Sequence, residues 1–103
     1  MDKVLYKEYT AQSTKTNFLF RKILGETLRL MRKENGWTLK ALSTMAGVSL
    51  SFMSEVERGE KEISSEVLYS ICKAFSIELD ILLDKVSSRY KLLRQIDNTF
   101  SGN

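Results

Sequence analysis

The chain of 103 residues contains no histidine, no proline and a single cysteine, Cys72. Histidine is the usual general base and, with cysteine, the usual zinc ligand, so neither a common hydrolase site nor a metal site is expected. One cysteine cannot form an internal disulfide. Proline interrupts helices, and its absence leaves long segments free to be helical. The sequence therefore favours an all-α chain without a cofactor, a metal or catalytic chemistry.

Long apolar runs are also missing, so that no segment is expected to cross a membrane and no signal peptide is expected at the N-terminus. The cytoplasm is therefore the expected location. The hydrophobic fraction of 43% and the charged fraction of 28% are typical of a globular domain. One domain is expected over residues 18–86, preceded by an N-terminal arm at 1–17 and followed by a C-terminal extension at 87–103.

The net charge of +3 is unevenly distributed along the chain. Residues 18–37 carry five basic and two acidic side chains, whereas residues 60–86 carry three basic and six acidic ones. An anionic partner would meet the first segment. The alternative is that mixed charges merely keep a small protein soluble.

Apolar residues recur at spacings of three and four, which is typical of amphipathic helices, and no stretch alternates as a strand would. Serine, threonine and glycine mark the helix ends. Five helices are expected: 21–35, one between Thr38 and Gly47, one between Ser49 and Gly59, one from Ser64 or Ser65 to Phe75, and a short one at 77–83. A sixth helix is plausible in the C-terminal extension.

The second and third helices are joined by only about three residues, which is typical of two helices that cross steeply. Gly47 tolerates the positive φ that such a corner needs, and Ala46 is small enough to line the crossing. Phe52, Met53 and Val56 are assigned to packing. The opposite face of the third helix then exposes Ser49, Leu50, Ser51, Ser54 and Glu55.

The run from Trp37 to Gly59 resembles the helix-turn-helix of the Cro and phage-repressor superfamily, also called the xenobiotic-response-element family. The resemblance extends over about Ile23 to Leu83. It implies a five-helix phage-repressor-like domain that binds a double-stranded DNA operator and regulates transcription. Within the family, the segments at 57–62, 64–66 and 71–72 are similar to regulators of Clp-protease genes, which implies a bacterial source and either activation or repression.

The family pattern implies a role for each matching position. Ser49, Leu50, Ser51, Ser54 and Glu55 align with base-reading positions, and Thr38, Lys40, Arg58 and Lys61 with positions that approach the DNA backbone. Arg32 and Glu57 align with a structural ion pair. Two departures matter: Leu39 replaces a glutamine that touches the backbone, and Glu55 replaces a basic or amide residue. A carboxylate there would accept from a cytosine amino group, and Leu50 could contact a thymine methyl.

One recognition helix reads too few base pairs to be selective, and relatives solve this by pairing two copies, so a homodimer is expected. The apolar residues Ile81, Leu82, Tyr90, Leu93 and Phe100 lie after the DNA-reading unit and are the expected interface. The alternative is that residues 87–103 fold back on their own core or stay disordered.

Two rival functions belong to other classes. Some relatives use the same fold as a protein-binding module, such as an antitoxin or a bridging factor. An enzyme is remote, because histidine, a metal cluster and a glycine-rich phosphate loop are all missing, and no small-molecule site is evident. Cys72 lies on an apolar helix face, where it is expected to behave as a small hydrophobic residue and not as a redox switch.

Overall fold

The computed structural model describes the backbone of residues 3–101 and the side chains of residues 19–96. Over these residues the fold is all-α, as predicted, with five helices and no strand. The helices are α1 (Lys3–Glu34), α2 (Leu39–Ala46), α3 (Leu50–Glu57), α4 (Ser65–Phe75) and α5 (Leu79–Ser101). The side chain of Phe100 lies outside the described residues.

The first helix begins at Lys3 and not near Arg21, so the segment expected as an N-terminal arm is part of α1. That segment holds no glycine or proline that would interrupt a helix, but its apolar positions are too sparse to predict one. The helix ends as expected. Arg32 and Lys33 occupy its last turn, where basic groups favour the negative end of the helix dipole, and Gly36 then adopts a left-handed φ of 69°.

The last helix also differs from the prediction. A short helix at 77–83 and a separate one in the C-terminal extension were expected, but α5 is one continuous helix of 23 residues. No glycine or proline occurs within it, and Ser87 and Ser88 continue the helix without interrupting it. Serine is a moderately poor helix former, and its propensity is outweighed here by packing of the first turns of α5 on the core.

The core is apolar and is built mainly by α1 and the three short helices. Its buried members are Ile23, Leu24, Leu28, Met31, Leu42, Ala46, Met53, Val56, Ile71, Cys72, Leu82 and Val86. Leu82 corrects one prediction: its side chain is 0% exposed and belongs to the core of a single chain, so it offers no free surface to a second copy. Trp37 closes one end of the core by stacking on Phe75, with ring centroids 5.1 Å apart.

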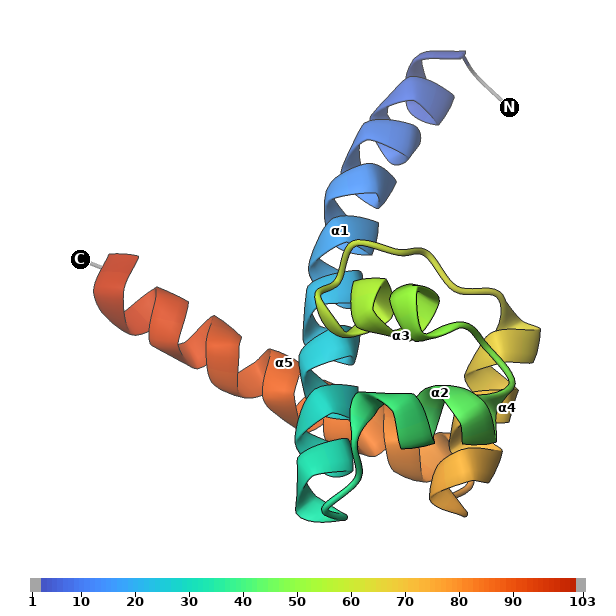
Figure 1. Ribbon diagram of the computed structural model, residues 1–103. Coiled ribbons are helices and arrows are strands. Elements are labelled where there is room, and N and C mark those ends of the chain that lie inside the picture. The colour runs from blue at the N-terminus through green and yellow to red at the C-terminus, as the bar shows by residue number, and fades with distance from the viewer. Residues whose placement is uncertain (1–2, 102–103) are drawn as a thin grey trace.

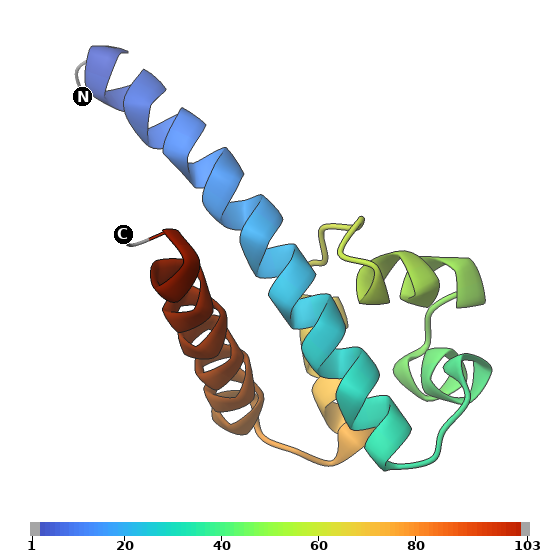
Figure 2. The same ribbon diagram turned by 90° about the vertical axis from the view of Figure 1, so that its left-hand side faces the viewer.

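The two long helices cross each other, and the three short ones lie together beside α1 (Figure 1). The helix α3 packs on the C-terminal half of α1, and α2 packs on both α3 and α4. The helix α5 begins beside α4, crosses α1 and emerges on the other side of it (Figures 1 and 2). In both views the N-terminal half of α1 and the C-terminal half of α5 extend beyond the region where the short helices pack. The side of the molecule that carries α3 is therefore separate from the free half of α5.

Candidate nucleic-acid interface

The corner between α2 and α3 has the geometry that the sequence predicts. Gly47 ends α2 in the left-handed conformation, with φ 72° and ψ 31°, and its N–H donates to carbonyl oxygens of the last turn. Thr38 and Ser49 cap the starts of the two helices: the Thr38 hydroxyl accepts from the N–H of Ala41 at 3.0 Å, and that of Ser49 accepts from Phe52 at 3.1 Å. Both helix starts are therefore fixed by local bonds.

The third helix is fixed to α1 by a close backbone contact that the sequence reading did not identify. Gly25 lies inside the C-terminal half of α1, and a Cβ atom there would come within 2.3 Å of the Val56 carbonyl oxygen. Glycine lowers helix stability in such a position, so its presence inside a helix is the one sequence signal for this contact. From the same side, Met53 and Val56 bury their side chains in the core. These contacts set the depth and orientation of α3.

Because one face of α3 is held in the core, the start of the helix on the opposite face is exposed. Ser49, Leu50 and Ser51 are exposed, and the Leu50 side chain retains 49% of its accessible surface although it is apolar. Ser54 and Glu55, one turn further on, are half-buried. The structure thus brings the five residues that were predicted to read bases onto one surface at the beginning of α3.

The residues predicted to contact the DNA backbone lie at the ends of the two short helices. Thr38 and Lys40 are exposed at the start of α2. Arg58 and Lys61 are exposed just after α3, where the Lys61 ammonium lies 5.7 Å from the centroid of the Phe52 ring. Leu39 is partly buried against the core and so leaves no polar group at that position.

Arg32 and Glu57 form the ion pair that the sequence resemblance implies. Arg32 Nε donates to Glu57 Oε2 at 2.7 Å, and Nη2 donates to Oε1 at 3.0 Å. A further bond runs from Nη1 to the carbonyl oxygen of Trp37 at 2.8 Å. The hydrogen bonds with Glu57 raise the pKa of the Arg32 guanidinium, against the opposing effect of burial. The pair ties the end of α3 to α1.

The described part of the chain offers neither a cluster of metal ligands nor a membrane-spanning helix, and its single cysteine is buried. No group of three or more acidic or cysteine side chains that could hold a metal ion occurs among the described residues. No helix within the part of the chain that the structure describes is long and apolar enough to span a membrane. Cys72 is buried, and this burial, with a smaller effect of the Glu78 charge, raises the pKa of its thiol.

Comparison with known proteins identifies the family of the chain. A helix-turn-helix family profile matches residues 28–82, more than half of the chain. The transcriptional regulator ClgR of Mycobacterium tuberculosis is 44% identical over 71 residues, which are 69% of this chain and 63% of the relative. The match therefore spans less than two thirds of that relative's length.

Solved structures agree with this assignment. The clp gene regulator ClgR of Corynebacterium glutamicum is 38% identical with a TM-score of 0.64, over 68% of this chain and 90% of that one. The restriction-modification controller protein C.AhdI of Aeromonas hydrophila is 27% identical with a TM-score of 0.58, over 60% of this chain and 94% of that one. With its capped α2, its glycine corner and its exposed α3, the chain belongs to the helix-turn-helix family of Cro and phage-repressor type.

Proposed function

We propose that this protein is a transcriptional regulator that binds double-stranded DNA by placing the start of α3 in the major groove. The observation that carries the proposal is the exposed surface of Ser49, Leu50 and Ser51 on a helix whose opposite face is locked in the core. A major groove accepts an α-helix, and residues at the helix start then meet base edges. The relatives above are themselves described as transcriptional regulators.

Each reading residue offers a distinct contact. The hydroxyl groups of Ser51 and Ser54 donate or accept, the Glu55 carboxylate accepts from a cytosine amino group, and Leu50 contacts a thymine methyl group. Exposure of a leucine at this position is unfavourable in water, and burial against a methyl group would remove that penalty. We therefore expect the preferred half-site to contain a thymine and a cytosine beneath the start of α3.

Phosphate contacts come from the start of α2 and from the basic residues near the two helices. Thr38 accepts a helix N–H with its hydroxyl oxygen, which leaves the hydroxyl hydrogen free to donate to a phosphate oxygen. The exposed Lys40 and Lys61 add positive charge at either end of the motif. These contacts fix the position of the protein on the duplex without reading its sequence.

We further propose that the protein binds DNA as a homodimer, because two copies double the number of base pairs read. Nine large apolar side chains that are exposed lie on the two long helices, and only Met45, Leu50 and Tyr69 lie elsewhere in the described part of the chain. The nine are Leu19, Phe20, Leu30, Ile81, Leu83, Tyr90, Leu92, Leu93 and Ile96. Exposed apolar side chains that gather on two helices are typical of an interface.

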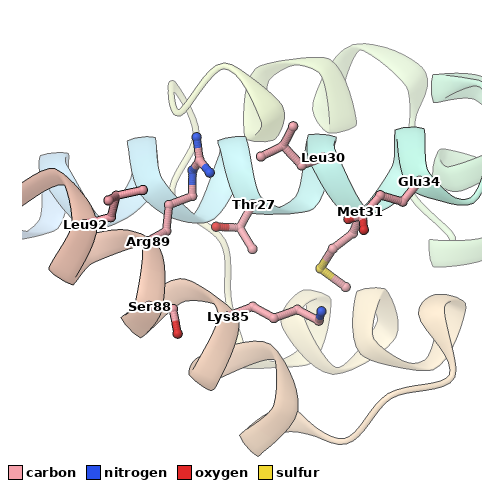
Figure 3. Close-up of a pocket in the computed structure, with 8 residues that line it drawn as sticks. All are labelled: Thr27, Leu30, Met31, Glu34, Lys85, Ser88, Arg89 and Leu92. Carbon is pink, nitrogen blue, oxygen red and sulfur yellow. The ribbon is translucent and has the colours of Figure 1, made fainter.

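Two hollows lie along the seam between α1 and α5. One of about 340 Å³ has Leu30 and Met31 on the α1 side and Leu92 on the α5 side, as Figure 3 shows. The other, of about 350 Å³, is lined by Leu19, Ile23, Tyr90, Leu93 and Arg94. We propose that a second copy covers the second hollow with its own α5, because the apolar sides of both helices meet there. Of the residues predicted for the interface, Ile81, Tyr90 and Leu93 are exposed and available for it.

Selection from a random pool of DNA duplexes tests the proposed function. The expected product is an enriched site with two inverted half-sites, centred one helical turn or about 10 base pairs apart. Its affinity should fall steeply with salt, because phosphate contacts release counterions. Duplexes from upstream of protease genes are suitable competitors, since ClgR of C. glutamicum is described as a clp gene regulator. A pool that shows no enrichment would instead favour a protein-binding module.

A further inference from the structure

The guanidinium group of Arg58, just beyond α3, is held by two neighbours. Its Nε donates to Glu60 Oε1 at 3.0 Å, and its Nη1 donates to the Ser54 hydroxyl. The side chains of Arg58 and Glu60 are 54% and 51% exposed, so solvent and larger ligands reach both. A DNA phosphate accepts from a guanidinium as a carboxylate does, and the two anions would compete for the same donor.

The backbone at this point is fixed, so that only the side chain can exchange partners. Lys22 Nζ donates to the Arg58 carbonyl oxygen at 2.9 Å. Gly59 is buried with a φ of 71°, and a Cβ atom on it would lie 2.8 Å from the Cα atom of Lys22. An exchange of partners by the Arg58 guanidinium therefore requires only that its side chain rotate away from Glu60.

The same arginine is linked to the reading surface of α3. Ser54 lies four residues before Arg58, which places the two side chains on one face of the helix end. Ser54 is also among the residues proposed to face the bases, and Glu55 follows it directly. The position of α3 relative to the bases thus determines how close a phosphate comes to the Arg58 guanidinium.

We propose that Glu60 competes with DNA phosphate for Arg58 and so decides on which duplexes Arg58 binds a phosphate. This inference rests on the proposed DNA-binding function. On a duplex without the preferred bases, α3 does not make its base contacts, and Arg58 keeps its ion pair with Glu60. On a preferred site, base contacts bring a phosphate close enough to displace the carboxylate. Removing the Glu60 carboxylate should therefore raise the affinity for both kinds of duplex, but it should add a phosphate contact only on unrelated DNA.

The test compares Glu60→Gln with Glu62→Gln, which removes the same charge from the same segment. Glu62 is a suitable control because its carboxylate lies near Arg21, at 3.8 Å, and is highly exposed. Affinity is measured over a range of salt for a random-sequence duplex and for the duplex selected by the unaltered chain. Glu60→Gln should bind the random duplex about two- to fivefold more tightly, as expected for loss of an exposed pair. The slope of its log affinity against log salt concentration should become steeper by about 0.9, the value for one added phosphate contact.

On the selected duplex the salt dependence of Glu60→Gln should stay unchanged, because Arg58 already binds phosphate there. Adding Arg58→Ala to Glu60→Gln should abolish the gain on the random duplex. Equal effects of Glu60→Gln and Glu62→Gln, or an unchanged salt dependence on the random duplex, would overturn the role of Glu60 alone. An unaltered chain that binds no duplex would overturn the proposed function and this role with it.

Discussion

Arg32 and Glu57 meet through two parallel hydrogen bonds, at 2.7 and 3.0 Å, in a site where their side chains are only 13% and 6% exposed. A buried pair of this kind is costly to break, because the remaining charge is left without a partner. Glu57→Ala should lower the free energy of unfolding by about 3–5 kcal/mol. Water that enters the site and solvates Arg32 would reduce this loss. Urea denaturation followed by circular dichroism measures the change.

The exposed pair of Arg58 and Glu60 provides the matched control. Glu60→Ala should change stability by about 1 kcal/mol or less, because exposed ion pairs contribute little. Equal denaturation midpoints for the Glu57 and Glu60 variants would show that the Arg32 pair has no special structural role.

Gly25→Ala should destabilise the protein and weaken DNA binding. Alanine favours a helix over glycine by about 1 kcal/mol, but its methyl group would lie 2.3 Å from a backbone oxygen of Val56 that cannot easily move. Overpacking of this kind typically costs about 1–3 kcal/mol and would displace α3. Gly36→Ala is the comparison, because a methyl group there meets nothing within 4 Å and only the backbone conformation is strained. If Gly25→Ala bound DNA as the unaltered chain does, the close contact would not be setting the position of α3.

Cys72 should react slowly with thiol reagents in the folded protein. The thiolate is the reactive form, and burial raises the pKa of the Cys72 thiol, so the folded chain holds little thiolate at pH 8. Labelling in denaturant should be faster, because unfolding exposes the thiol and removes the effect of burial on its pKa. With rising pH, labelling of the folded chain should accelerate only above the pH at which the unfolded thiol ionises. Fast labelling of the folded chain at pH 8 would indicate an accessible, activated cysteine.

Leu93→Asp should separate the proposed dimer, because it places a charge in the apolar hollow between α1 and α5. Lys91→Asp is the control, since it introduces the same side chain at an exposed position of α5. Sedimentation should show a monomer for the first variant and a dimer for the second, with circular dichroism verifying that both stay helical. A dimer that persists in Leu93→Asp would show that the interface does not include this hollow.

The local features of the motif were predictable because they depend on single residues. A left-handed Gly47 and the capping hydroxyls of Thr38 and Ser49 act within one turn of the chain, so the sequence predicts α2 and α3 accurately. The Arg32 and Glu57 pair is 25 residues apart in sequence and was predicted only through the family resemblance.

The long helices were less predictable, because a regular apolar spacing marks only part of each helix. The N-terminal half of α1 lacks helix-breaking residues but also lacks a regular apolar face. Leu82 shows a second limit: its spacing fits the core and the interface equally, and only packing of α5 against the core decides between them. The partners of Arg58 likewise depend on how the chain turns after α3.

The most direct measurement compares the sites selected from one random duplex pool by the unaltered chain, by Glu55→Gln and by Lys61→Ala. Glu55→Gln should change the preference at one base pair of each half-site, by about 1–3 kcal/mol, because an acceptor-only group becomes an amide. Lys61→Ala should select the same sequence with lower affinity, because a phosphate contact carries no sequence information. Unchanged sites for Glu55→Gln, or altered sites for Lys61→Ala, would contradict the proposal that the start of α3 reads the DNA.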